Sequence, residues 1–296
     1  MKKGRIIRQL QYEVFLLPAI LAFTAFTVIP LLKTLLYSFT DFDGVLHTYN
    51  FVGLKNYYAV FRDDVMKQAL FNTLFYTFFS VLLINAISVP LAVLLDKNQR
   101  VKTLERAIFF FPSVVSALLL GYIWTYILSP LKTGALNSIL MNTFGLSKPI
   151  GFTSGGWIAK FSIIAVSVWA NTGWHTMVNI AYLQAIDSTY YEAASIDGAS
   201  KLDQFRFITI PLLAPAMTVN TLLLLTNGLK VYDLPYALTK GGPGYSNYTV
   251  TQIIIQRGIS ERQYGVSTAL AAIFILLVMI ISIIQYTPMS RKEVEA

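Results

Sequence analysis

Cysteine is absent from this chain of 296 residues, and histidine occurs only twice, as His47 and His175. The lack of cysteine excludes disulfides, thiolate metal sites and cysteine nucleophiles. The two histidines lie in separate segments without a cluster of carboxylates, so no catalytic or metal-binding constellation is predicted. We interpret His175 as a hydrogen-bonded interior residue. The phosphate-binding pattern G-x-x-x-x-G-K-[ST] is also missing, so the chain is predicted to bind no ATP and to be no enzyme.

Charge is the second scarcity. Only 13% of the residues are charged, against roughly 25% in soluble domains, while 55% are hydrophobic and the mean hydropathy is +0.58. So few charges cannot solvate the surfaces of two globular domains. The net charge of +8 could indicate nucleic acid as a partner. The basic residues are scattered around apolar segments and form no stripe, which argues against nucleic-acid binding.

Long hydrophobic runs are what the chain does contain. Each run lacks Asp, Glu, Lys and Arg and reaches the ~18–20 residues that a helix needs to cross a bilayer. The runs are residues 14–32, 69–95, 107–128, 161–186, 207–229 and 264–289. Because spanning segments must satisfy their backbone groups internally, we expect helices. The predicted fold is an all-α integral membrane protein of six transmembrane helices, with the six-helix domain at 14–289, a short N-terminus at 1–13 and a tail at 290–296.

Lysine and arginine indicate the orientation. One set of connecting segments is short and rich in these residues, which is typical of the cytoplasmic side. Its basic residues are Lys2, Lys3, Arg5, Arg8, Lys97, Arg100, Lys102, Arg106, Lys201, Arg206, Arg291 and Lys292. Both termini and the segment 187–211 are therefore predicted to be cytoplasmic.

The segment 187–211 carries its own helix signals between two apolar runs. Thr189 and Glu192 have the spacing of a capping box, which predicts a short helix over 190–196. Gly198 is expected to end it in the left-handed conformation. Ser200 and Asp203 offer a second helix start, and a proline follows at 211. The sequence thus predicts two short helices hinged at a glycine beside the membrane.

These residues resemble the EAA loop of binding-protein-dependent ABC importer permeases. The pattern is Glu192-Ala193-Ala194, then Gly198, then Ile208 and Ile210-Pro211, with isoleucine at 210 where the family usually has leucine. The resemblance implies a type I importer permease fold and a loop that docks on an ATPase. The implied docking residues are Glu192, Ala193, Ala194, Asp197, Gly198, Ile208 and Pro211.

Further stretches resemble the carbohydrate-importing, maltose-type branch of this family. They are residues 51–57, Asn72-Thr73, Phe111-Pro112, Trp124, residues 231–234 and residues 238–244. The Gly-Gly-Pro-Gly run at 241–244 is similar to the maltose-permease subunit that carries the larger outer loop. The resemblance implies a multi-pass protein of a bacterial-type inner membrane that forms half of a sugar pore.

The resemblance also implies the partners. They are a second, homologous permease subunit in a heterodimer, two cytoplasmic ATPase subunits that bind ATP and Mg, and an extracellular solute-binding protein. The chain itself would hold no cofactor and would contact lipid and the sugar. ATP-driven closure of the ATPases would rotate the spans and alternate the access of the pore.

Polar side chains inside the fourth and fifth runs are candidates for the sugar path, since polar groups in a bilayer generally face a cavity. The candidates are Asn171, Trp174, Asn179, Asn220, Asn227 and Tyr232. Amides suit sugar hydroxyls and rings suit apolar sugar faces. The same residues could instead hold helices together, and both interpretations stay open. The absence of charge in the runs argues against an ionic substrate.

Two other classes of function remain. An ion-coupled secondary transporter usually has a titratable residue in the membrane, and only His175 qualifies. A membrane scaffold would leave the polar spans unexplained. Within the importer interpretation, a neutral solute other than a sugar is an alternative.

Overall fold

The computed structural model describes residues 14–45, 48–97 and 102–294, with the side chains of 97, 102 and 286–294 left undescribed. The predicted N-terminus 1–13, His47 and Arg100 lie outside the described residues. The chain forms two compact units, one of residues 1–63 and 254–275 and one of 64–253 and 276–296. Each is described by itself. No strand occurs within the described ranges, where pairing is limited to the bridge between Thr40 and Phe51.

The first unit contains the helix Val14–Tyr37, which includes the π-helical η1 (Thr24–Val28) and α2 (Ile29–Tyr37). It also contains α3 (Lys55–Arg62), η3 (Gln256–Ser260) and the beginning of α15 (Tyr264–Val294). Arg257 makes ion pairs of 2.8 Å with Asp63 and 2.6 Å with Glu261. This triad fastens the end of α3 to η3.

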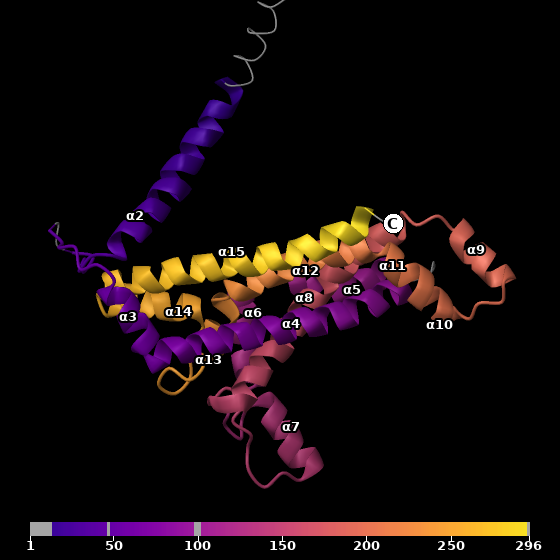
Figure 1. The fold of residues 1–296 in the computed structure, drawn as a ribbon. Coiled ribbons are helices and arrows are strands. Elements are labelled where there is room, and N and C mark those ends of the chain that lie inside the picture. The colour runs from indigo at the N-terminus through magenta and orange to yellow at the C-terminus, as the bar shows by residue number, and fades with distance from the viewer. Residues whose placement is uncertain (1–13, 46–47, 98–101, 295–296) are drawn as a thin grey trace, which may run out of the picture. The chain divides into compact units, whose positions relative to one another are not determined.

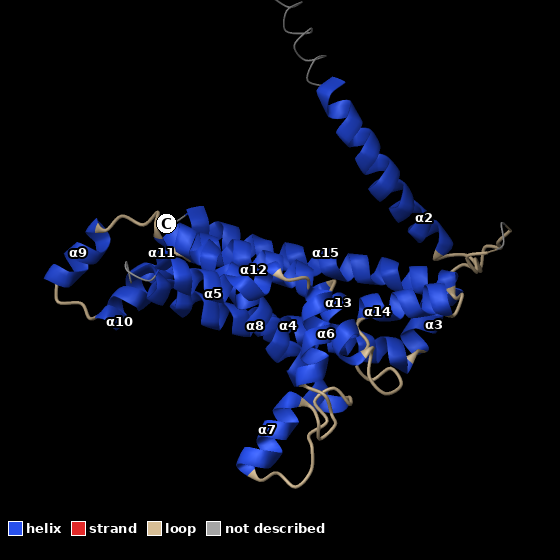
Figure 2. Ribbon diagram, turned by 180° about the vertical axis from the view of Figure 1, so that it is seen from behind, coloured by secondary structure: helices blue, strands red, loops and turns tan. Residues whose placement is uncertain are grey.

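The second unit is a helical bundle (Figures 1 and 2). Its helices are α4 (Asp64–Lys97), α5 (Lys102–Val114), α6 (Ala117–Ile127), α7 (Ala135–Phe144), α8 (Gly156–Leu183), α9 (Thr189–Ile196), α10 (Lys201–Gln204), the π-helical η2 (Phe205–Thr209), α11 (Ile210–Leu212), α12 (Ala214–Leu229) and α13 (Asp233–Thr239). The short α14 (Val250–Ile255) ends at the boundary of the unit.

Helix α8 is central to this bundle and packs against α4, α5 and α12. Ile84, Ile164, Val168 and Leu224 form one of the buried apolar clusters that join α4, α8 and α12. Gly173 lets α8 approach α5 closely, because a Cβ there would collide with the backbone carbonyl of Phe109. These contacts fix the helices that surround the polar cleft described below.

Three helices of the described chain are long and apolar enough to cross a membrane, namely Val14–Tyr37, Asp64–Asp96 and Tyr264–Gln285. They match the predicted runs 14–32, 69–95 and 264–289. Two bent pairs pass the same test together, Thr103–Val114 with Ala117–Ile127 and Lys201–Leu212 with Ala214–Leu229, which makes up to five spans. The sixth prediction, 161–186, falls on α8. Its 28 residues are long enough to span. Its amides and hydroxyls make α8 more polar than the helices named above, and α8 is not among the helices that pass the test.

The predicted continuous runs 107–128 and 207–229 are not straight helices, and this corrects the sequence analysis. The first is bent by 95° and the second by 65°. Ser116 adopts an extended ψ of 133° and separates α5 from α6. At the second bend, Pro211 and Pro215 flank Leu213, and proline removes a helix donor and crowds the preceding turn. Apolar composition alone did not reveal either break.

Candidate functional site

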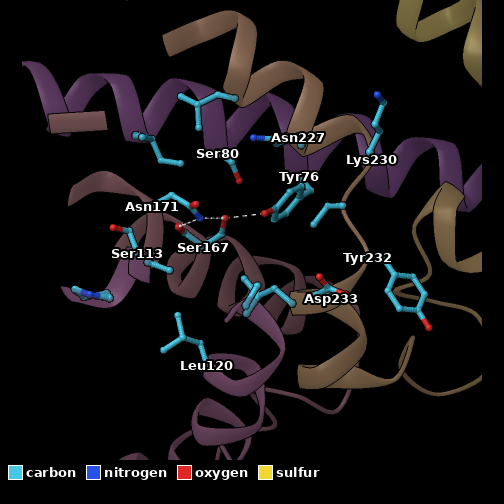
Figure 3. A pocket seen from close by; sticks show the side chains of 18 of the residues that line it. Tyr76, Ser80, Ser113, Leu120, Ser167, Asn171, Asn227, Lys230, Tyr232 and Asp233 are labelled. Atoms are coloured by element: carbon cyan, nitrogen blue, oxygen red, sulfur yellow. Dashed lines mark hydrogen bonds between the residues drawn. The ribbon is translucent and has the colours of Figure 1, made fainter. Parts of the chain in front are cut away.

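A polar cleft of about 440 Å³ opens where α5 gives way to α6. Residues of α4, α5, α6, α8 and α12, and of the segment 230–234 after α12, line it. Val115, at the 95° break, and Ala117, at the start of α6, both line it. Figure 3 shows Ser113 and Asn171 on one side of the cleft and Tyr232 and Asp233 on the other.

Hydroxyls and amides on α4 and α8 form the polar wall. The Tyr76 hydroxyl lies 2.7 Å from Ser167 Oγ, and Asn171 Nδ2 donates to the Ser167 backbone carbonyl at 2.8 Å. Ser167 and Asn171 face the same way because they are four residues apart on a helix. Asn227 adds an exposed amide from α12. The wall is uncharged and can exchange hydrogen bonds with a polyhydroxylated ligand.

The residues after α12 bring an aromatic ring and two charges to the cleft. Lys230, Tyr232 and Asp233 all line it. The Tyr232 ring stacks on Tyr236 at a centroid distance of 5.2 Å and an interplanar angle of 13°. Partial burial, with the neighbouring Tyr236 and Asp233, raises the pKa of the Tyr232 phenol above its usual 10. The phenol is therefore neutral at physiological pH and can donate a hydrogen bond.

The structure separates five of the six predicted pathway residues into two groups. Asn171, Asn227 and Tyr232 line the cleft. Asn179 and Asn220 are fully buried instead, and Asn220 Nδ2 donates to Asn179 Oδ1 at 2.8 Å. Asn179 also donates to Ser88 Oγ at 3.2 Å, so these two amides tie α4, α8 and α12 together.

Trp174 and His175 lie beside this amide pair. The Trp174 ring packs edge-on against the His175 ring at 4.8 Å and is partly exposed. His175 Nδ1 is 2.8 Å from Asn220 Oδ1, and the side chain is buried. The expectation of a hydrogen-bonded interior histidine is confirmed. No group of three or more potential metal ligands occurs in the part of the chain that the structure describes.

Sequence reasoning missed several lining residues of the cleft. Tyr76 and Ser80 are one helical turn apart on α4, and this spacing of polar side chains inside an apolar run was the available signal. Ser113 precedes the break between α5 and α6. Lys230 gave no signal, and Asp233 was noted only within the stretch 231–234, because both follow the apolar run and line the cleft from the segment after α12.

The second candidate region is the segment 187–211, which we call the coupling loop. It contains α9 and α10 and extends from one end of the bundle (Figures 1 and 2). Glu192, Ala193 and Asp197 are exposed, whereas Ala194 is half-buried. Ile208 is half-buried in η2, and Pro211 is exposed in α11. We call the residues before Gly198 and those after it the two arms of the loop. The implied docking residues therefore lie on both arms.

The predicted capping box of Thr189 and Glu192 is wrong, and the N-cap side chain makes no bond to the backbone at the start of α9. Thr189 is the first residue of α9, and Ser188 is its N-cap. The Ser188 hydroxyl donates to Glu192 Oε1 at 3.0 Å, and Asp187 Oδ1 accepts the Thr189 backbone N–H at 2.9 Å. This second bond lowers the pKa of Asp187. The Glu192 carboxylate thus accepts a hydrogen bond from the Ser188 hydroxyl, which precedes the helix, and does not take part in the predicted capping box.

The hinge and the second helix agree with the sequence analysis. Gly198 has a φ of +81°, and no other atom lies within 4 Å of the place where a Cβ would stand. Ser200 and Asp203 form a complete capping box at the start of α10. The Ser200 hydroxyl and backbone N–H both donate to Asp203, and these bonds lower the pKa of that carboxyl.

Exposed apolar side chains on the coupling loop are an unexpected feature. Ile196 is 86% exposed, Leu202 73% and Phe207 66%. Large apolar groups so open to solvent are a common mark of an interaction surface when they lie together. Here they alternate with Glu192, Lys201 and Arg206 along the segment. The loop offers both apolar anchors and charged groups to a partner.

Comparisons with known proteins agree with this arrangement. Residues 84–291 match the family described as binding-protein-dependent transport system inner membrane component. The probable starch degradation products transport system permease protein AmyD of Thermoanaerobacterium thermosulfurigenes is 30% identical over 300 residues, covering 99% of each chain. The osmoprotective compounds uptake permease protein GgtC of Synechocystis sp. is 32% identical, covering 94% of this chain and 99% of the relative.

A solved structure has the same fold. A chain of a bacterial ABC transporter involved in the import of the acidic polysaccharide alginate superposes with a TM-score of 0.85. The alignment covers 97% of this chain and 98% of that chain, at 20% sequence identity. Helices, bends and the projecting loop thus belong to an importer-type membrane architecture.

Proposed function

Because the chain belongs to the family of binding-protein-dependent transport system inner membrane components, we propose that it is half of the pore of an ATP-driven sugar importer. As a membrane-spanning transport subunit it is not an enzyme. The observation that carries the sugar assignment is the cleft of about 440 Å³, whose lining combines amides, hydroxyls and a neutral phenol with apolar side chains. Such groups match the hydroxyls and the apolar ring face of a neutral saccharide.

The substrate class is further supported by a relative whose name refers to starch degradation products, aligned along almost the whole chain. Oligosaccharides of that kind carry no charge. Lys230 and Asp233 place one positive and one negative group at the same cleft, so the net charge of this pair favours neither an anion nor a cation. A neutral saccharide or short oligosaccharide is the proposed cargo.

The proposed partners follow from the two regions of the molecule. A second, homologous permease subunit completes the pore, and its subunit type differs from this one, which carries the outer Gly-Gly-Pro-Gly run. Two ATPase subunits bind ATP and Mg and receive the coupling loops on the cytoplasmic side. An extracellular binding protein delivers sugar from the opposite side. Both termini of this chain then lie in the cytoplasm, and the protein resides in the inner membrane.

In the proposed cycle, the coupling loop connects the ATPases to the cleft through one helix. The loop ends with η2 and the start of α11, and the chain then continues into α12. Helix α12 supplies Leu224, Asn227 and Gly228 to the cleft. When ATP draws the ATPases together, the docked loops move and α12 turns with them. Because this helix lines the cleft, the same movement changes the access of the sugar site.

A different neutral solute is the second candidate for the cargo. The relative named for osmoprotective compounds is 32% identical to this chain, and a hydroxyl- and amide-lined cleft suits other polyhydroxylated solutes equally. An ion-coupled carrier fits less well. His175 is occupied by its contact with Asn220, and the described apolar helices offer no carboxylate along the six predicted runs for coupling.

The test is uptake by the reconstituted complex. The chain, a partner permease, the ATPase and the binding protein are placed in proteoliposomes and supplied with labelled maltodextrins of increasing length or with a polyol. Asn171→Ala and Asn227→Ala should each reduce uptake several-fold, because each removes a hydrogen bond to the cargo. Asn142→Ala, which alters an exposed amide on α7, serves as the control. Uptake that follows an ion gradient and ignores ATP would overturn the importer assignment.

A further inference from the structure

Four side chains join the two arms of the coupling loop across the bend at Gly198. Gln204 Nε2 donates to Ser195 Oγ at 2.8 Å, which links α10 to α9. The hydroxyls of Tyr191 and Thr209 are 3.1 Å apart, which links α9 to η2. The bonded residues are separated by 9 and 18 positions in the chain. They therefore close the loop on itself.

One partner of each contact is buried although most of the loop is exposed. Gln204 is only 5% exposed and Thr209 only 4%. A buried amide is costly when it lacks partners, and here both ends of the Gln204 amide are satisfied, since Lys201 Nζ donates to its Oε1 at 3.2 Å. Ser195 Oγ passes the connection on to the Tyr191 backbone carbonyl at 2.7 Å. The network is continuous from one arm to the other.

The network ends on a segment of unusual backbone. Thr209 is the last residue of the π-helical η2, and its hydroxyl also donates to the Gln204 carbonyl five residues earlier at 3.3 Å. π-helical turns are rare and occur often at functional positions. Here the π-helical turn is the connection through which the loop enters α11 and α12.

A cavity of about 220 Å³ lies between the loop and the bundle. Tyr191, Gln204 and Thr209 line it on the loop side, and Val93, Asp96 and Leu183 line it on the bundle side. Side chains that face a cavity lack packing partners in that direction. Around this cavity the side-chain bonds of Tyr191, Gln204 and Thr209 go to other residues of the loop, whereas Phe205 of η2 packs against the bundle cluster of Val89, Leu213 and Ala216.

We infer that Tyr191, Ser195, Gln204 and Thr209 form a brace that makes the coupling loop move as one body. These are positioning residues. They hold the docked helix α9 to the base of α12, so that a displacement of α9 reaches the cleft instead of being absorbed at the Gly198 hinge. This inference rests on the proposed import function, and it assigns a mechanical role to residues outside the Glu192-Ala193-Ala194 pattern.

The experiment deletes single hydroxyls and measures coupling. Tyr191→Phe and Thr209→Val each remove one partner of the same bond with little change of shape. Thr218→Val is the matched control, because Thr218 is an equally buried threonine whose hydroxyl bonds only within α12, to the Ala214 carbonyl at 2.9 Å. Three quantities are measured in the reconstituted complex: ATPase-subunit affinity, ATP hydrolysis rate, and cargo molecules imported per ATP hydrolysed.

In the brace variants, import per ATP should fall about threefold to tenfold, the range expected for one net hydrogen bond. ATPase-subunit affinity should stay within about twofold, since the docking surface is unchanged. The double variant should be no worse than the more severe single variant, because both lose the same bond. Thr218→Val should couple like the unmodified chain. Unchanged import per ATP in all brace variants would overturn the inference.

A cross-linking experiment distinguishes a mechanical role of the brace residues from a role in folding alone. The chain has no cysteine, so Ser195→Cys with Gln204→Cys can be linked by a short bifunctional thiol reagent in a complex with cysteine-free partners. The unlinked variant should be uncoupled and the linked one recoupled. A linked variant that stays uncoupled contradicts the brace. Failure of the proposed function looks different, because then the unmodified complex shows no ATP-dependent uptake.

Discussion

The cleft and the coupling loop are built in opposite ways. The cleft is assembled from five helices and the segment 230–234, so its lining residues come from positions 76 to 234 of the chain. The coupling loop is built from nearer neighbours, since its side-chain bonds join residues at most eighteen positions apart. A site made from distant residues changes when whole helices move. A loop held by local bonds keeps its own shape and can carry that movement.

The two regions also differ in what they expose. The cleft offers hydroxyls and amides that already bond with one another, as Tyr76, Ser167 and Asn171 do. The loop exposes Ile196, Leu202 and Phe207. Polar groups that exchange partners suit a cargo that must leave again, whereas exposed apolar anchors suit a protein that stays bound. Within the proposed function, this difference favours transient binding of the cargo at the cleft and lasting attachment of a partner at the loop.

The largest expected effect comes from the hinge of the loop. Gly198→Val should abolish import, because a left-handed φ of +81° costs a non-glycine residue ~1–2 kcal/mol and a β-branched one more. No neighbouring atom obstructs the new side chain, so the defect is one of backbone direction. Uptake and assembly are measured together, and an assembled complex that hydrolyses ATP without import is the expected result.

Gly145→Val is the matched control for this hinge prediction. Gly145 ends α7 with a φ of +70° and also has no atom within 4 Å of an added Cβ. Both variants therefore carry the same backbone strain in open surroundings. Import should persist in Gly145→Val. Equal loss in the two variants would show that strain alone, and not the direction of the coupling arms, explains the effect.

The second prediction asks whether the coupling loop and the segment between α7 and α8 lie on opposite sides of the membrane. Ala193 and Ser147 are both exposed, the first on α9 and the second in the segment between α7 and α8. A cysteine at Ser147 should react with an impermeant thiol reagent applied outside intact cells, and one at Ala193 should react only after the cells are opened. Labelling of both from outside would contradict the cytoplasmic assignment of the loop.

The third prediction concerns the carboxylate of the loop. Glu192→Gln keeps an oxygen that can accept from the Ser188 hydroxyl, so the start of α9 should survive. If Glu192 meets a basic residue of the ATPase, losing its charge should weaken docking by ~2 kcal/mol, about 30-fold. Glu105→Gln on α5 serves as a charge-matched control. ATPase affinity in detergent is the measurement, and an unchanged value would leave Glu192 a structural acceptor.

The loop was readable from the sequence because its determinants are local. Gly198 and the box of Ser200 and Asp203 were predicted correctly. The first capping box was predicted wrongly, because the three-residue spacing of Thr189 and Glu192 favoured a cap, whereas Thr189 already lies inside α9 and the Ser188 side chain makes no cap bond. The family resemblance based on this loop is confirmed by the match over residues 84–291, and the all-helical importer permease fold by the structural likeness.

Only part of the cleft could be predicted from the sequence. Asn220 and Asn227 are identical side chains seven residues apart, which places them on the same face of α12. One is fully buried against His175 and Asn179, while the other is exposed at the cleft. Asn227 lines the same cleft as Ser113, Val115 and Ala117 around the break after α5, whereas Asn220 does not line it. The extended Ser116 causes that break without a glycine or a proline at the position itself.

The smallest expected effect tests how local the caps of the loop are. The Ser200 hydroxyl and backbone N–H lower the pKa of Asp203 below its ordinary 3.8. A carboxyl whose pKa is lowered by folding stabilises the folded state above its unfolded pKa, and this contribution is lost as pH falls through the folded pKa. The start of α10 should therefore be insensitive to pH from 7 down to 5 and should loosen only in strong acid.

Hydrogen–deuterium exchange of the peptide that contains Ser200 measures this loosening, after correction for the intrinsic pH dependence of exchange. Protection of the Ser200 amide should be constant near neutral pH and fall in acid. Asp203→Asn should remove the acid-dependent step while leaving the Gln204–Ser195 bond. Lining residues of the cleft should show no change over the same range, because the cap acts within one helical turn. A parallel change at Asn171 would contradict the separation of the two regions and make the loop and the cleft one cooperative unit.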